Sequence, residues 1–330
     1  MSAITIDSLR KEYGDTFAVD GLSLSVAPGE VFGFLGPNGA GKSTTIDALL
    51  GYVRPTAGTI TVLGRDAATE SRAVREAVGV LPDGYALYDR LTAREHVAMA
   101  ASFRGGDDDP EAVLSRVGLA DAADRRAGGF SKGMAQRLAL GMALVGDPDV
   151  LVFDEPSSGL DPTGIAALRR IVAAEADRGT TVFFSSHDLA QVEATCDRVA
   201  IVDDGRLVAL DTVAGLRERY GALATLSVAA DPLPDLAPLR ALEGVASVAV
   251  DGDRVVCRCT SADAKVRALR AVFDGDCRVR DADAEPASLE DLFAASVGES
   301  GRTDEADDPA PAAAPAGAGP YATTATGEGE

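Results

Sequence analysis

Residues 36–44 combine glycines with a lysine and two hydroxyl side chains at a spacing that suits phosphate chemistry. The segment is Gly36, Pro37, Asn38, Gly39, Ala40, Gly41, Lys42, Ser43 and Thr44, and it matches the pattern G-x-x-x-x-G-K-[ST]. Glycines let the backbone wrap around phosphates, while Lys42 can reach the β- and γ-phosphates and the Ser43 hydroxyl can bind Mg²⁺. An apolar run, Val31–Leu35, precedes the segment and a helical run, Thr45–Leu50, follows it. This strand–loop–helix context predicts a P-loop that binds ATP or a similar nucleotide.

Two acids follow another apolar run. Asp154 and Glu155 come directly after Val150–Phe153. A carboxylate at the carboxyl end of a strand faces the crevice where nucleotides bind, so Asp154 is predicted to hold Mg²⁺. Glu155 is predicted to orient or deprotonate the attacking water. His187 ends a further apolar stretch, and its position alone fits either a γ-phosphate sensor or a packed or surface residue.

A second stretch with anion-binding character lies about ninety residues after the P-loop. Residues 129–137 begin with small residues and continue into helix formers. A helix start of this kind presents free backbone N–H groups, which attract anions. Ser131 and Gly133 are the candidate binding residues. The P-loop already accounts for one phosphate chain, so these residues alone leave open whose phosphate the second stretch would hold.

The motifs must be positioned by an alternating α/β fold. Short apolar runs alternate with helical patterns as far as about residue 220, which is typical of a parallel sheet covered on both faces. The expected strands are Ile4–Ile6, Val31–Leu35, Val150–Phe153, Thr181–Phe184 and Arg198–Val202. Between Leu87 and Val145 the pattern turns helical, so a helical insertion is expected there. His96 lies within it and is expected to have a structural role.

The order of elements changes after Tyr220. We expect strands at 224–230, 245–250, 255–260 and 277–279, helices at 236–242, 262–273 and 288–296, and a hairpin turn at Asp251-Gly252. This βαββαβα order indicates a small ferredoxin-like α+β domain. From about Gly298 the Ala, Pro, Gly and acidic residues cannot supply a core, so a disordered tail is expected. The expected domains are 1–220, with a helical subdomain at about 84–147, then 221–297 and the tail 298–330.

The charge and residue composition exclude some classes of partner and indicate the protein's environment. The formal net charge of −21 argues against nucleic acid, because neutralising phosphates needs clustered Lys and Arg. Only four of the 31 basic residues are Lys, which suggests adaptation to high salt; codon bias with an acidic tail is the alternative. Without a spanning apolar run or signal-peptide pattern, a cytoplasmic protein is expected, with any membrane role mediated by a partner. The four cysteines are expected to be free thiols, and Cys257 and Cys259 to pack rather than bind metal.

Taken together, these stretches resemble the ATP-binding subunit of ABC transporters over about residues 1–215. The motifs that carry the resemblance are the P-loop, Ser131–Met134 as a variant signature motif, the acids Asp154 and Glu155, Ser158–Asp161 as the D-loop, His187 as the switch histidine and Tyr13 as the aromatic that stacks on adenine. The resemblance implies a P-loop NTPase fold with a RecA-like core, an N-terminal antiparallel β subdomain and a helical subdomain.

Two motifs depart from the family's usual pattern, at Asp83 and in the signature. Asp83 stands where a glutamine is usual; an ionised Asp cannot donate a hydrogen bond and is shorter by one methylene. Contact with Mg²⁺ or nucleotide through Asp83 is therefore expected to differ. Lys132 and Met134 replace the common Gly and Gln of the signature, and Lys132 either adds a cation near the phosphates or is a solvated side chain. Both variations resemble ATPases of the ABC-2 exporter type, and residues 287–293 are similar to that group's closing segment.

The resemblance also implies how the residues act. Two ATPase subunits would close head to tail, each ATP lying between one P-loop and the other subunit's signature helix. The residues implied to bind Mg-ATP are Lys42, Ser43, Thr44 and Asp154. Glu155 would catalyse hydrolysis, His187 would stabilise the γ-phosphate, Ser131 and Gly133 would act in trans, and Asp161 would link the two sites. A homodimer on a polytopic membrane permease, at the inner face of the cell membrane and working in export, is expected.

A soluble ABC ATPase that acts on ribosomes or DNA is the alternative. DNA-repair members carry long coiled coils between the P-loop and the signature, and translation-type members carry two such domains, whereas this chain has neither feature. A P-loop kinase or another small NTPase would not explain the signature, the D-loop and His187. The transported substrate is not encoded in these motifs, because its pocket would belong to the permease.

Overall fold

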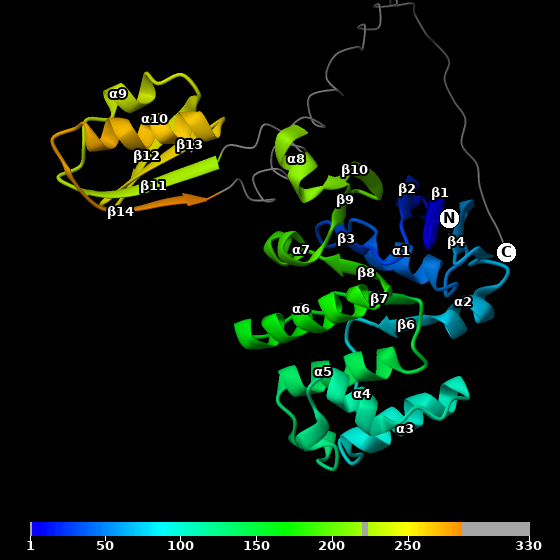
Figure 1. The fold of residues 1–330 in the computed structure, drawn as a ribbon. Coiled ribbons are helices and arrows are strands. Elements are labelled where there is room, and N and C mark those ends of the chain that lie inside the picture. The colour runs from blue at the N-terminus through cyan, green and yellow to red at the C-terminus, as the bar shows by residue number, and fades with distance from the viewer. Residues whose placement is uncertain (1, 220–223, 286–330) are drawn as a thin grey trace, which may run out of the picture.

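A six-stranded sheet lies at the centre of the N-terminal part of the chain (Figure 1). The computed structural model describes residues 2–219 and 224–285. The sheet order is β10-β9-β3-β8-β7-β6, and neighbouring strands are parallel except for β10, which is antiparallel to β9. The strands are β3 (Val31–Leu35), β6 (Val78–Leu81), β7 (Val150–Asp154), β8 (Thr181–Ser186), β9 (Arg198–Asp203) and β10 (Arg206–Thr212). This sheet confirms the predicted α/β fold.

Burial on both faces explains why these strands are apolar throughout. Phe183 points into one hydrophobic cluster, where its ring stacks on Phe32 with centroids 5.8 Å apart. The next residue, Phe184, points into the other cluster, because successive side chains in a strand face opposite sides. Helix α1 (Lys42–Leu49) covers the first face, and α6 (Pro162–Asp177) with α7 (Leu189–Thr195) covers the second. The carboxyl ends of β3, β8 and β7 therefore meet at one edge between the two layers.

A second sheet is antiparallel and packs on the α1 side. Its order is β2-β1-β4-β5, and its strands are β1 (Ile4–Tyr13), β2 (Thr16–Val26), β4 (Ala57–Val62) and β5 (Arg65–Asp66). Helix α2 (Ser71–Ala77) follows it. Apolar residues of β1, β2 and β4 share one cluster with α1 and the central sheet. The hairpin between β1 and β2 is thereby held over the start of α1, where the P-loop ends.

The helical insertion lies between β6 and β7. Its helices are α3 (Ala93–Arg104), α4 (Pro110–Arg116) and α5 (Lys132–Leu144), with short 3₁₀ turns at Ala120–Ala122 and Ala127–Gly129. His96 is fully buried, with Nδ1 2.8 Å from the Thr92 carbonyl oxygen and Nε2 accepting from the Tyr88 N–H, which confirms its expected structural role. Arg116 donates to both carboxylate oxygens of buried Glu175 at 3.2 and 2.6 Å. This bidentate pair fastens the insertion to the end of α6.

A separate four-stranded antiparallel sheet is formed by residues 224–285. Its elements run β11 (Ala224–Asp231), α9 (Ala237–Arg240), β12 (Val245–Asp251), β13 (Arg254–Cys259), α10 (Ala262–Phe273) and β14 (Arg278–Glu285), in the sheet order β12-β13-β11-β14. This is the ferredoxin-like arrangement that the element order predicts. Cys257 and Cys259 are buried in its core beside Val272, as free thiols.

Some expected boundaries differ from those observed. Strand β14 is longer than the expected 277–279, and the hairpin loop is Gly252–Asp253, because Asp251 still pairs with Arg254. The expected helix 288–296, the closing segment 287–293 and the tail 298–330 lie outside the described residues. So do the junctions near 220 and 297, and the domain limits stay predictions. In the described part of the chain, no helix is both long and apolar enough to cross a membrane.

Candidate nucleotide-binding site

The P-loop connects β3 to α1, and its backbone packs closely against β2 and β9. Gly41 has a φ of 92°, in the left-handed region, and a Cβ on it would collide with the Ala18 carbonyl oxygen. A Cβ on Gly36 would collide with the backbone of β9. Lys42 Nζ donates to the Gly36 and Pro37 carbonyl oxygens at 2.7 and 3.1 Å. The loop therefore requires its glycines, and it holds the buried ammonium at its centre.

A cavity of about 210 Å³ lies over this loop. Its lining residues are Ala18, Asn38, Gly39, Gly41, Lys42, Ser43, Thr44, Asp83 and Glu155. The structure thus brings Asp83 and Glu155, which are distant in the sequence, to the predicted phosphate loop. Ala40, within the loop, is buried and does not line this cavity.

Asp154 ends β7 and accepts a hydrogen bond from the neighbouring strand. Ser185 Oγ donates to Asp154 Oδ1 at 2.6 Å, and the nearby Ser43 hydroxyl lowers the pKa of this carboxylate. Burial raises the pKa of Asp154, the Ser185 bond lowers it, and the charges of Glu155 and Asp83 raise it further. Crowding by two like charges makes this edge of the sheet attractive to a cation.

Glu155 occupies a strained turn directly after Asp154. Its φ is 47°, and its N–H donates to Ser185 Oγ at 3.0 Å. One carboxylate oxygen lies 2.8 Å from His187 Nδ1, and the other lies 3.4 Å from Lys42 Nζ. An ionised carboxylate can only accept, so Nδ1 must carry the proton of the His187 contact. Glu155, after β7, therefore contacts both Lys42 of the P-loop and His187, which follows β8.

The residues at this edge fit a magnesium nucleotide. Mg²⁺ in nucleotide sites commonly takes one or two carboxylates together with phosphate oxygens, and Asp154 with Ser43 supplies the protein part of such a set. One oxygen of Glu155, Oε1, is buried; it accepts no hydrogen bond from the described residues, although the Lys42 ammonium lies 3.4 Å away. This oxygen can still accept a hydrogen bond, and an attacking water would provide the donor.

Tyr13 lies at the end of β1, in the hairpin next to the P-loop. It pairs with Thr16, two residues before Ala18, which lines the nucleotide cavity. The ring is 51% exposed, and Lys11 Nζ lies 4.7 Å from its centroid. An exposed aromatic face beside the phosphate loop can stack on a base, so this geometry is compatible with the predicted adenine contact.

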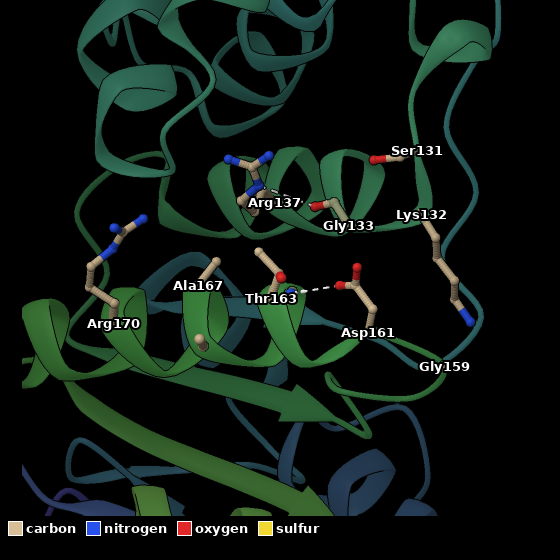
Figure 2. Close-up of a pocket in the computed structure, with 11 residues that line it drawn as sticks. Ser131, Lys132, Gly133, Arg137, Gly159, Asp161, Thr163, Ala167 and Arg170 are labelled. Carbon is tan, nitrogen blue, oxygen red and sulfur yellow. Dashed lines mark hydrogen bonds between the residues drawn. The ribbon is translucent and has the colours of Figure 1, made fainter.

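The signature residues lie in a different cavity (Figure 2). Ser131 caps the start of α5 and accepts from the Met134 N–H, while a Cβ on Gly133 would meet open space. The Asp161 side chain caps α6 by accepting from the Gly164 N–H at 2.8 Å. The volume of this cavity is about 570 Å³, and it shares no lining residue with the P-loop cavity. Within one chain, Ser131 and Gly133 therefore do not join the P-loop site.

Two further residues, which the sequence motifs did not indicate, belong to the site. Ser185 is fully buried in β8 and binds Asp154 and Glu155 at once. Gln136 is buried in α5 and donates through Nε2 to the Pro156 carbonyl oxygen, so it connects the signature helix to the turn after Glu155. Ser185 directly follows the expected strand Thr181–Phe184, and this position at a strand end was the sequence feature that could have indicated it. No local sequence feature indicated Gln136.

The sheet, the phosphate loop and the acids at adjoining strand ends define a P-loop NTPase. The family model described as "ABC transporter" matches residues 19–158. A fluoroquinolones export ATP-binding protein of Mycobacterium tuberculosis is 42% identical over 201 residues, which cover 61% of this chain and 67% of that one. A Nod factor export ATP-binding protein I of Paraburkholderia xenovorans is 35% identical over 301 residues, covering 88% and 96%.

Solved structures agree with these sequence relatives. An ATP-binding subunit of an ABC transporter superposes with a TM-score of 0.60 at 30% identity, covering 67% of this chain and 94% of that one. A bacterial Atm1-family ABC exporter with ATP bound gives a TM-score of 0.59 at 28% identity, covering 66% and 40%. The chain belongs to the ABC transporter family, as an ATP-binding subunit that hydrolyses ATP to drive transport. The relatives do not support the alternative of an ATPase acting on ribosomes or DNA.

Proposed function

We propose that this chain powers export by closing, as a pair of identical subunits, around two molecules of Mg-ATP. The observation that carries the proposal is the separation of the P-loop cavity from the signature cavity within one chain. Each cavity supplies half of the predicted phosphate contacts, so a second copy is needed to complete a site. The names of the relatives, which are export ATP-binding proteins, support the direction.

At the P-loop side, residues of one chain bind Mg-ATP and activate the attacking water. Lys42 holds the β- and γ-phosphates, while Ser43 and Asp154 hold the metal. Bound Mg²⁺ would neutralise charge that develops on the transferred phosphoryl group. Glu155 accepts a proton from the attacking water, or orients it, from a carboxylate that His187 steadies at 2.8 Å.

The second copy contributes its signature residues. Gly133 presents open backbone at the helix start, and Ser131 lies on the same cavity, so both can face a phosphate on the partner's P-loop. Asp161, which lies on that cavity too, holds the N-terminus of α6 in place and so shapes the contact surface. Loss of the γ-phosphate removes the shared contacts and reopens the pair.

An apolar groove offers a docking surface for a membrane permease. It lies between β6 and the helices α3 and α5, and its volume is about 570 Å³. Phe103 on α3 lines it and is 82% exposed, and Tyr52 lines it and is 62% exposed. Pro82, beside Asp83, also lines the groove, so movement of a partner there can reach the nucleotide site. We propose that a cytoplasmic segment of the permease occupies this groove, which places the chain at the inner face of the membrane.

The groove is tested by Phe103→Asp. A charge in an apolar interface is costly to bury, so co-purification with the permease encoded beside this chain is expected to fall at least tenfold. Nucleotide binding by the isolated chain is expected to be unchanged. Phe273→Asp is the matched control, because Phe273 is 60% exposed on α10, outside the groove. Equal recovery of the permease with Phe103→Asp and wild type would refute this docking surface.

We also propose adaptation to high salt, supported by the net charge of −21. Screening weakens repulsion between exposed carboxylates, and the Debye length falls from about 10 Å at 0.1 M to about 3 Å at 1 M. Raising KCl from about 0.1 M to about 2 M is therefore expected to raise the melting temperature, by more than isosmotic sorbitol does. A melting temperature that stays constant or falls would count against the proposal.

A further inference from the structure

Gln136 is a buried polar side chain in the middle of α5, the helix that begins at the signature residues. The other buried residues of α5 are leucines, alanines and one glycine. Gln136 Nε2 donates to the Pro156 carbonyl oxygen, in the turn directly after Glu155. A buried hydrogen bond is costly to lose because water cannot replace the missing partner, so this contact fixes α5 against the turn.

The turn that receives this bond has a strained backbone. The φ of Glu155 is 47°, in the left-handed region that side chains other than glycine rarely adopt. Ser185 Oγ accepts from the Glu155 N–H at 3.0 Å, and Gln136 donates to the next carbonyl along the chain. A strained backbone persists only where its surroundings hold it in place. Ser185 of β8 and Gln136 of α5 hold this turn from two different parts of the fold.

Gln136 lies beside the acids without reaching the phosphate loop. Together with Asp154 and Glu155 it lines a cavity of about 370 Å³. It does not line the cavity over the P-loop, where the nucleotide phosphates are expected. Gln136 can therefore influence hydrolysis through the backbone at Glu155, whereas direct contact with the phosphates of its own chain's nucleotide is not expected.

We propose that Gln136 is a positioning residue for ATP hydrolysis. By holding the Pro156 carbonyl, it keeps the turn in the conformation that aims the Glu155 carboxylate at the attacking water. Because Gln136 belongs to α5, a shift of the signature helix also shifts this turn and with it Glu155 of the same chain. The inference rests on the proposed role of Glu155 as the group that activates water.

Gln136→Met tests the positioning, because methionine has a similar length but donates no hydrogen bond. The kcat for ATP is expected to fall roughly 10- to 100-fold, since a small displacement of a catalytic group costs about this much. The Kd of a single chain for ATP is expected to be unchanged. Leu140→Met, one turn further along α5, is the matched control and is expected to hydrolyse ATP as wild type does. An unchanged kcat in Gln136→Met, with Glu155→Gln inactive, would overturn this inference alone.

Gln136→Glu supplies a second readout, the pH dependence of hydrolysis. This side chain keeps the shape of glutamine, and its carboxyl can donate to the Pro156 carbonyl only when protonated. Burial and the neighbouring Asp154 and Glu155 would raise its pKa. Its rate relative to wild type is therefore expected to rise as the pH falls from about 8 to about 6. A ratio that is independent of pH would contradict the role of the hydrogen bond.

Mixed pairs show on which chain Gln136 acts. Gln136→Met mixed with Ser131→Arg leaves one site with Glu155 and Gln136 from the second chain and Ser131 from the first, so up to about one quarter of the wild-type rate is expected. Gln136→Met mixed with Glu155→Gln is expected to show no such gain, because the remaining Glu155 belongs to the altered chain. No gain in the first mixture, although mixed pairs form, would show that the variant damages the signature instead and would overturn the inference. Wild-type hydrolysis by Glu155→Gln would refute the proposed role of Glu155, and this inference with it.

Discussion

Glu155→Gln is expected to lower the rate of ATP hydrolysis by about 10²- to 10⁴-fold, the range for loss of a general base. The amide keeps the shape of the side chain but cannot take a proton from water. Lys42 and Ser43 remain in place, so ATP still binds and holds two chains together. The variant is therefore expected to accumulate as an ATP-bound dimer, because closure no longer leads to hydrolysis.

Single-turnover hydrolysis and sedimentation with Mg-ATP measure the two halves of this prediction. Glu76→Gln, an exposed acid on α2, serves as the control and is expected to behave as wild type. Wild-type hydrolysis by Glu155→Gln would show that another group activates the water. A monomeric variant in saturating ATP would contradict the proposed trapped dimer.

Ser131→Arg is expected to abolish hydrolysis while sparing ATP binding by a single chain. The P-loop cavity contains no signature residue of its own chain, so an arginine at position 131 leaves that cavity unaltered. In the pair, the long side chain would occupy the space where the partner's γ-phosphate must lie, and the site formed by those two surfaces could not be completed.

Equilibrium binding of a fluorescent ATP analogue and steady-state hydrolysis separate these effects. Ser115→Arg is the matched control, since Ser115 is an exposed serine on α4 of the same helical insertion. Loss of nucleotide binding in Ser131→Arg would place the signature in the same site as its own P-loop. Unimpaired hydrolysis would remove Ser131 from the mechanism.

Local sequence patterns were sufficient to predict which residues lie at the sheet edge that carries the site. The P-loop, Asp154 and His187 each follow an apolar run, and parallel pairing of those runs brings them together. Three of the strands are buried along nearly their whole length, so their apolar character was a direct consequence of the layers on both sides. Family resemblance supplied the antiparallel sheet, which the isolated run Ile4–Ile6 could not have indicated.

Contacts between residues far apart in the sequence could not be predicted from local sequence patterns. The Ser185 bonds to Asp154 and Glu155 join positions about thirty residues apart, and they depend on the register of β7 against β8. Strand β14 alternates charged and small residues at a sheet edge, so its hydrophobic signal ends after Val279. The place of the Lys132 ammonium, against Gly159, likewise depends on how the fold brings the start of α5 to the loop after β7.

The central claim is that each hydrolytic site combines the P-loop of one chain with the signature of another. Mixing Ser131→Arg with Glu155→Gln tests it directly, because the mixed pair contains one site with an intact Glu155 from the first chain and an intact Ser131 from the second. Each variant alone is expected to be inactive, whereas an equimolar mixture is expected to regain up to about one quarter of the wild-type rate, since half of random pairs are mixed and each holds one intact site. A mixture that stays as inactive as its components, although mixed pairs form, would contradict the account.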